Sequence, residues 1–326
     1  MKKVLFATTA LALSAGVAAA EVKFGGDARM GLQYNSAGWT GANTPTVRLE
    51  KRFTLNIDGS TTTDGGVTLA ARARIRSDEN AGAAVSGARV SASFAGLTVT
   101  AGNIDSPIEQ MGVMYRPLYG LGTGLGWTQL VGNVTGRGHA QFAWDSFSST
   151  GNGAEGISLQ YSMAGFTLRA SHSSEGLRAG TGGNVQRTAV GAAYTFQGWT
   201  FEAAYQDATA SAAAYAPGTN LNTIEDKLIL GVSGAIGQFG VGLAYGIHGA
   251  DANRINKIVG DVSYRIDSLT LSAFVANQDF STGITNPTTF GVGATYGLGG
   301  GATLGAAVQS TPTGTTRGDL GVSFRF

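Results

Sequence analysis

The last ten residues of the chain, Arg317-Gly-Asp-Leu-Gly-Val-Ser-Phe-Arg-Phe326, alternate strictly between two kinds of side chain. The apolar ones share one phase, and they are Leu320, Val322, Phe324 and Phe326. Successive side chains of a β-strand point to opposite faces, so this segment predicts a strand with one apolar and one wet face. Such a strand is typical of a transmembrane β-barrel, whose outer face meets lipid and whose inner face meets water.

The same alternation recurs along the chain. Between Val22 and Tyr34 the apolar residues take one phase, while Lys23, Asp27 and Arg29 take the other. A helix would scatter these charges around its circumference. Reading forward in this way predicts sixteen strands, near residues 22–34, 47–58, 67–76, 86–94, 97–102, 156–163, 166–173, 187–196, 199–206, 226–236, 239–248, 256–266, 269–277, 288–296, 302–309 and 317–326.

The expected connections alternate in length. The short ones are 59–66, 95–96, 164–165, 197–198, 237–238, 267–268 and 297–301, and the long ones are 35–46, 77–85, 103–155, 174–186, 207–225, 249–255, 278–287 and 310–316. Short turns on one rim, long loops on the other and an even strand count match a bacterial outer-membrane barrel. We therefore predict an all-β, 16-stranded antiparallel transmembrane β-barrel with one long loop folded into its lumen.

Aromatic residues gather beside the short turns, where an aromatic girdle at the membrane interface would lie. They are Phe94, Phe166, Phe196, Trp199, Phe239 and Tyr296. Ordinary strand aromatics would explain their presence but not their position.

The amino terminus predicts a signal peptide over residues 1–20. Lys2 and Lys3 precede an apolar run from Val4 to Val17, and Ala18-Ala19-Ala20 offers a cleavage site between Ala20 and Glu21. An uncleaved anchor is the alternative, but the run is shorter than the ~20 residues that a spanning helix needs. The mature barrel domain is then expected over residues 21–326.

Charge and cysteine content exclude several classes. Removing Lys2 and Lys3 from the 22 basic residues leaves 20 against 21 acidic ones, so the formal charge falls from +1 to −1. This balance implies no nucleic-acid partner. The chain contains no cysteine, so neither a disulfide nor a thiolate metal site is expected to hold the fold.

The stretch from 103 to 155 is far longer than the usual ~2 to 5 residues of a hairpin loop. Its first part, 103–116, contains Ile108, Met111, Val113, Met114 and Tyr115, which is too apolar for a freely solvated loop. We expect it to fold inward and constrict the lumen, rather than to lie outside the barrel. The strand-like patch from Gly138 to Phe147 is assigned to this loop, because a seventeenth strand would put one terminus on the wrong rim.

Arginines concentrate in the early strands at the phase opposite to the apolar residues. Those expected to point into the lumen are Arg29, Arg48, Arg52, Arg72, Arg74, Arg76 and Arg89. One interpretation is a solvated basic face. The sharper one sets this wall against Asp105 and Glu109 of the loop, giving a transverse field across the constriction. Lys51 departs from the pattern, because it falls in the outward phase.

Catalytic candidates are few. The histidines are His139, His172 and His248, and none has a recognisable metal-ligand spacing, so we predict no enzyme and no metal site. Each is expected in a loop or at a rim.

Small residues in the outward phase would allow the wall of a second barrel to approach closely, although alanine is common throughout the chain. These residues are Gly26, Ala28, Ala71, Ala73, Ala88 and Ala92.

The chain resembles the general porins of Gram-negative bacteria, especially those of the alphaproteobacterial, Rhodobacter-like type. The resemblance rests on Glu-Val-Lys-Phe-Gly-Gly-Asp-Ala-Arg-Met-Gly at 21–31, on Ala164-Gly165-Phe166 and on Asp-Leu-Gly-Val-Ser-Phe-Arg-Phe at 319–326. It implies a homotrimer of 16-stranded barrels in the outer membrane, surrounded by lipid. It also implies a third extracellular loop folded into each pore and passive diffusion of small hydrophilic solutes.

Carried over residue by residue, the family's constriction sets Arg48, Arg52, Arg72, Arg74 and Arg76 against Asp105 and Glu109, with Tyr115 and Arg116 on the same loop. By resemblance, Phe326 is the signal read by the barrel-assembly machinery. Members of the family can hold calcium near the loops, but no dense acidic cluster here carries that over. A substrate-selective channel, an outer-membrane enzyme and a structural or adhesive barrel remain as alternatives.

Overall fold

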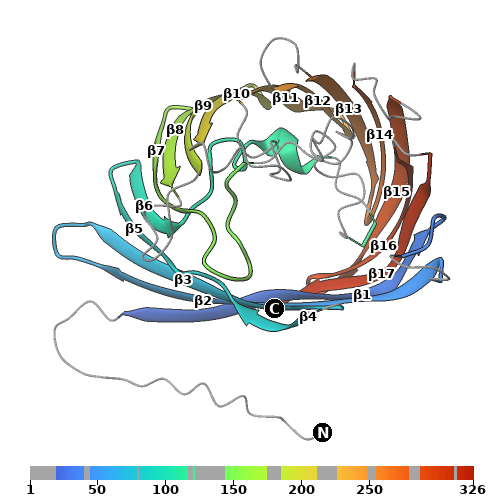
Figure 1. Cartoon of the computed structure of the whole chain (residues 1–326), viewed down its shortest axis with the longest axis horizontal. Helices are drawn as coiled ribbons and strands as arrows, with labels where there is room; N and C mark the ends of the chain where they lie inside the picture. The colour runs from blue at the N-terminus through green and yellow to red at the C-terminus, as the bar shows by residue number, and fades with distance from the viewer. Residues whose placement is uncertain are drawn as a thin grey trace, which may run out of the picture.

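The computed structural model describes residues 20–39, 45–79, 81–116, 120–121, 144–174, 185–210, 226–248, 255–278, 287–311 and 314–326. The predicted signal peptide lies outside these residues except for Ala20, so its cleavage stays a prediction. The patch at 138–147 is described only from Trp144 onward. Over the described ranges the chain forms one antiparallel sheet closed into a cylinder (Figure 1).

Each strand pairs with its neighbours in sequence, except that β5 pairs with β3 and not with β4, and the last strand closes on the first. The strands are β1 (Glu21–Asn35), β2 (Val47–Thr62), β3 (Thr68–Asp78), β4 (Ala81–Val85), β5 (Arg89–Phe94), β6 (Leu97–Asn103), β7 (Glu155–Met163), β8 (Phe166–Ser174), β9 (Val185–Phe196), β10 (Trp199–Ala210), β11 (Lys227–Ile236), β12 (Phe239–His248), β13 (Ile255–Ile266), β14 (Leu269–Gln278), β15 (Thr288–Gly299), β16 (Ala302–Ser310) and β17 (Thr316–Arg325).

The cylinder has sixteen positions, as predicted, because β4 and β5 pair in line with the same edge of β3. The prediction for this position was wrong in detail. Residues 77–85 were expected to be a loop and 86–94 one strand, but the strand begins at Ala81 and breaks at residues 86–88. There Gly87 donates its backbone N–H to the carbonyl of Gly151, so the returning part of the long loop replaces the sheet as partner.

The closing strand confirms the interpretation of the carboxy terminus. β17 pairs with β1 from Arg325 opposite Asp27 to Arg317 opposite Asn35. Leu320 is 52% exposed on the outer face, whereas its neighbour Asp319 is 6% exposed on the inner face. In lipid each unpaired backbone group costs several kcal/mol, and a closed ladder leaves no edge strand.

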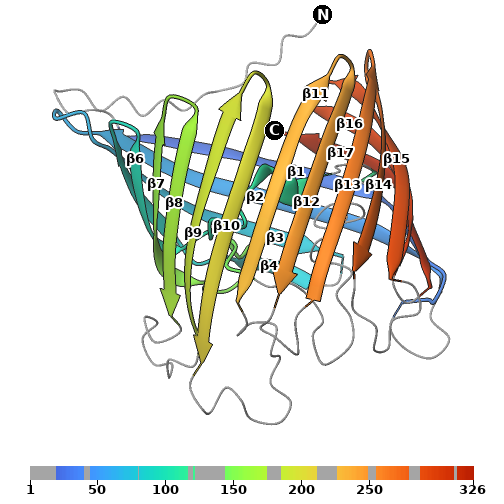
Figure 2. The same ribbon diagram turned by 90° about the horizontal axis from the view of Figure 1, so that it is seen from above.

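Two-residue turns at one end of the cylinder set the register of several hairpins (Figure 2). At Ala164 and Gly165 the φ angles are 49° and 83°. Two successive positive φ angles define the type I′ turn, whose twist matches that of the strands it joins. The exposed aromatics of the predicted girdle lie beside these turns, and Phe166 stacks on Tyr194 with ring centroids 4.2 Å apart.

Among the described residues, no helix has the length and apolar character that a membrane crossing requires. The one helical segment they contain is the short 3-10 helix η1 (Gly112–Tyr115), which lies inside the cylinder.

Candidate pore constriction

The first part of the long loop crosses the lumen and packs against the far wall, as predicted. From the end of β6 the chain runs inside the cylinder to η1, which lies near β11 and β12 (Figure 1). Its apolar side chains are buried against inward residues of the wall such as Ile229 and Phe274. The buried loop residues are Ile104, Ile108, Met111, Val113 and Met114, each at most 6% exposed. Tyr115 packs partly buried at the edge of the same cluster.

Glycines on the inner wall make room for this crossing. A Cβ built on Gly231 would lie 2.5 Å from Cγ2 of Val113, and one on Gly305 would lie 2.0 Å from the carbonyl oxygen of Gly120. Atoms this close overlap, so a larger residue at either position would have to displace the loop or the wall. The loop therefore lies in a groove that the wall itself provides.

Three carboxylates of the wall hold the crossing in place, and sequence reasoning missed all three. Glu202 accepts hydrogen bonds from the backbone N–H groups of Gly112 (2.9 Å) and Val113 (3.2 Å), at the start of η1. Asp261 accepts one from Nη2 of Arg116 at 2.9 Å. Asp319 accepts one from the backbone N–H of Leu121 at 2.9 Å. The sequence signal that could have identified them is an acidic residue at an inward-facing position of a strand in the second half of the chain.

The returning part of the loop is fastened to β8 and β9, beside the strand that carries Glu202. Asp105 accepts a hydrogen bond from the backbone N–H of Phe147 at 2.6 Å. Asp145 forms an ion pair with Arg187 of β9 at 2.8 Å and also accepts a hydrogen bond from Ser173 of β8. The described parts of the predicted constriction loop are thus bonded to the wall at both ends.

All seven arginines of the predicted basic wall lie on β1, β2, β3 and β5, and none is fully exposed. Five of them form ion pairs: Arg29 with Glu50 (2.5 Å), Arg48 with Glu79 (3.0 Å), Arg52 with Asp78, Arg72 with Asp58 (2.5 Å) and Arg89 with Asp105 (2.6 Å). Four of these carboxylates belong to the wall itself. Sequence reasoning overlooked them, although Glu50 and Asp58 share the inward phase of β2 with Arg48 and Arg52.

Arg74 and Arg76, next to each other on the inner face of β3, differ from the other five. Arg74 donates to Oδ1 of Asn56 (2.8 Å) and to Oγ of Ser149 (2.9 Å), and its guanidinium lies 4.8 Å from the ring centroid of Phe147. Arg76 has no hydrogen-bond partner among the described residues, and its Nε is buried. Within the described part of the chain, these two guanidinium groups of the basic wall form no ion pair with a carboxylate.

The acidic side of the expected transverse field differs from the prediction. Asp105 is in direct contact with Arg89, and no water-filled gap separates the two. Glu109 is turned into the loop, where it accepts a hydrogen bond from Nε1 of Trp144 at 2.7 Å. Burial raises the pKa of Glu109 to about 7, and the negative charge of Asp105 adds to this shift while the Trp144 hydrogen bond opposes it.

The described part of the chain holds no group of three or more His, Cys, Asp or Glu side chains that could bind a metal ion. His172 is exposed on β8 and shares a hydrogen bond with Thr188 at 2.9 Å. His248 is the buried last residue of β12, and His139 lies outside the described residues. The loop-bound calcium stays a prediction of the resemblance.

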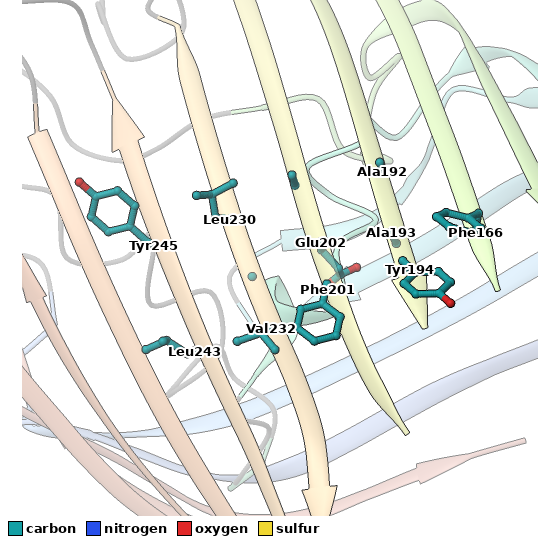
Figure 3. Close-up of a pocket in the computed structure, with 12 residues that line it drawn as sticks. Phe166, Ala192, Ala193, Tyr194, Phe201, Glu202, Leu230, Val232, Leu243 and Tyr245 are labelled. Carbon is teal, nitrogen blue, oxygen red and sulfur yellow. The ribbon is translucent and has the colours of Figure 1, made fainter. Parts of the chain in front are cut away.

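A hollow of about 440 Å³ lies on the outer wall and not on the path through the lumen. Figure 3 shows side chains around it from β8 to β12, among them Phe201, Leu230 and Leu243. These three are 43 to 51% exposed on the face expected to meet lipid. The hollow is therefore a depression of the apolar outer face.

Comparison with known proteins agrees with this geometry. Residues 7–316 match the family model described as Gram-negative porin. Curated relatives include porins of Fuscovulum blasticum, 27% identical over 319 residues, and of Rhodobacter capsulatus, 26% identical over 327 residues; each alignment covers 94% of this chain and all of the relative. Solved structures of Rhodopseudomonas blastica porin mutants superpose with a TM-score of 0.76 at 24% identity, over 94% of this chain and 100% of theirs. The chain belongs to the Gram-negative porin family, and it is an outer-membrane channel protein rather than an enzyme.

Proposed function

We propose that this porin is a general diffusion channel for small hydrophilic solutes and ions, narrowed by the loop that begins at residue 103. One observation carries the proposal: a loop bonded to the wall at both ends lies across a closed cylinder, opposite a wall of charged side chains. A constriction of facing polar groups passes hydrated solutes and disfavours apolar ones, which would strip ordered water from those groups.

We further propose a homotrimer whose contact surface includes the outer face of β1 to β3. Lys51 is exposed on this face, opposite Met30 of β1. A lysine facing lipid at the bilayer midplane costs about 2–4 kcal/mol, which a subunit contact or a position near the rim would avoid. Small outward residues such as Ala71 would allow a second wall to approach closely.

The proposal also covers export and assembly of the chain. Residues 1–20 would act as a signal peptide removed between Ala20 and Glu21, and Phe326 would be read by the barrel-assembly machinery. Phe326 is well placed for recognition at the rim, because its side chain is 53% exposed.

Purified protein added to a planar lipid bilayer should give stepwise increases in conductance, and detergent-solubilised protein should have the mass of three chains. Folded protein that inserted into bilayers without any conductance step would refute the channel proposal. A folded, conducting protein with the mass of one chain would refute the trimer alone.

The Glu202→Gln substitution is expected to loosen η1 on the wall. The carboxylate accepts two backbone N–H groups, and hydrogen bonds to a charged acceptor contribute about 1.5–3 kcal/mol each. We expect noisier single-channel currents and faster proteolysis within the loop, with an unchanged melting temperature of the barrel. Glu155→Gln is a matched control, because Glu155 is partly exposed at the start of β7. Quiet currents in the Glu202→Gln channel would contradict the assigned role of Glu202.

Docking of the loop, and with it the open-channel current noise, is expected to depend on pH through Glu109. Its pKa is about 7 with the loop docked and close to the ordinary 4.5 with the loop released. The docked state therefore binds more protons between these values, so docking is most stable below pH 4.5 and weakens as the pH rises to about 7. Open-channel noise should increase over this window in the wild type, and Glu109→Gln should remove the dependence. An equal pH dependence in both channels would contradict this assignment.

A further inference from the structure

We propose that Arg74 and Arg76 form a binding site for small oxyanions, with inorganic phosphate as the simplest ligand. The proposal rests on the channel function above and adds a class of preferred solute to it. Both residues lie on the inner face of β3, partly exposed, at positions i and i+2 of one strand, about 7 Å apart.

Their hydrogen-bonding capacity is largely unused. A guanidinium has five N–H donors. Toward the described residues Arg74 uses two of them, on the neutral acceptors Asn56 and Ser149, which leaves three. Arg76 donates none to the described residues, and a buried donor without an acceptor, such as its Nε–H, is unfavourable. An anion between the two side chains would supply acceptors of the right charge.

The charges around the pair leave it positive. On β2, Arg52 is neutralised by Asp78, and on β3 itself Arg72 is neutralised by Asp58. Asp27 and Asp78 are the carboxylates whose charges act on Arg76, but in the described chain neither forms an ion pair with it. Asp27 and Asp105 likewise act on Arg74 without an ion pair to it in the described chain, so the site holds two positive charges, without a contacting carboxylate among the described residues, between two ion pairs.

The geometry favours an oxyanion over a halide. The planar guanidinium presents two parallel N–H groups that match two oxygens of a phosphate or carboxylate. Arg74 is held in place from both ends of its guanidinium, by Asn56 and Ser149, and by stacking near Phe147. Arg76 makes no such hydrogen bonds to the described residues, so its donors remain available to the ligand. Binding of this kind must stay weak for the solute to leave again.

The test uses wild-type trimers in planar bilayers with potassium chloride at pH 8, titrated with potassium phosphate at constant ionic strength. Phosphate should reduce the chloride current in a saturable manner. In the Arg74→Gln, Arg76→Gln double variant, the half-blocking concentration should rise about tenfold or more, as expected when bidentate contacts to the anion are lost.

Two further variants separate a binding site from a general field. Arg72→Gln removes one positive charge from the same face of the same strand, but it removes it from an ion pair, and should change the half-blocking concentration less than about twofold. Arg76→Lys keeps the positive charge but loses the two parallel N–H donors of the guanidinium, so phosphate should block this channel more weakly than the wild type. If the double variant does not fold, the phosphate block of the Arg76→Lys channel still tests the binding site.

Equal effects of Arg72→Gln and of the Arg76 variants would overturn the site, as would a conducting wild-type channel that phosphate does not block. A wild-type protein without any conductance would refute the channel function instead, so the two failures are distinguishable.

Discussion

Replacing Gly231 with leucine is expected to drive the constriction loop off the wall and to raise single-channel conductance. The added Cβ would lie 2.5 Å from Cγ2 and 3.1 Å from Cβ of Val113, so the docked loop and the new side chain cannot share the space. Overpacking of this kind costs about 1–3 kcal/mol. The cost falls on the loop, because β11 is bonded to β12 along its whole length and to β10 from Lys227 to Ser233, which includes Gly231.

Gly260→Leu is the matched control for this prediction. It makes the same change within a strand, but its Cβ would meet only Cδ1 of Leu243, at 4.0 Å. This variant should conduct as the wild type does. Gly231→Leu channels with wild-type conductance and a protease-resistant loop would show that Val113 does not lie on Gly231 in the membrane.

Removing β17 is expected to abolish the folded barrel. This strand bonds to β16 on one side and β1 on the other, so its loss leaves two strand edges unpaired. Unpaired backbone groups in lipid cost several kcal/mol each, which exceeds the ~5–15 kcal/mol total stability of a typical protein after only a few groups. Chains ending at residue 315 should give no heat-modifiable band on gel electrophoresis, and a folded band from them would contradict the closure.

Deleting Phe326 alone should have a narrower effect. Its backbone exchanges hydrogen bonds with Gly26, at 2.9 and 3.1 Å, and its ring stacks on Phe53 with centroids 5.8 Å apart. We expect a smaller yield of folded barrels in cells, while those that form conduct normally. Phe24→Ala removes another exposed aromatic from the same wall, with 67% of its surface exposed against 53% for Phe326, and it should leave the yield unchanged. Equal yields of folded barrel from the wild type and from the Phe326 deletion would contradict a role of Phe326 in assembly.

The strands could be predicted from sequence because lipid and water impose opposite demands on alternate residues. Leu320 and Asp319 illustrate this, since one is half exposed on the outer face and the other is buried on the inner face. The prediction was wrong where a strand loses its regular partner. The polar run at 77–80 made the whole of 77–85 resemble a loop, although β3 extends to Asp78 and β4 begins at Ala81. The break at 86–88 coincides with a hydrogen bond from Gly87 to Gly151, far away in sequence.

The candidate site was less predictable than the fold. The apolar residues of 103–116 predicted an inward loop, but its position depends on Glu202, Asp261 and Asp319, which come from strands 90 to 198 residues away. The arginines were recognised by their shared phase. Their pairing with Glu50, Asp58, Asp78 and Glu79 depends on register between strands, which alternation within one strand does not specify.

A cysteine pair at positions 113 and 231 tests most directly that the loop lies across the lumen and constricts it. The native chain contains no cysteine, so any cross-link must join these two positions. The distance of 3.1 Å between their Cβ positions lies just below the ~3.5–4.5 Å range of disulfides, so a small shift permits the bond. We predict rapid cross-linking on oxidation, with conductance close to that of the wild type before and after reduction. Failure to cross-link in folded channels, or a large fall in conductance when the bond forms, would contradict the docked loop.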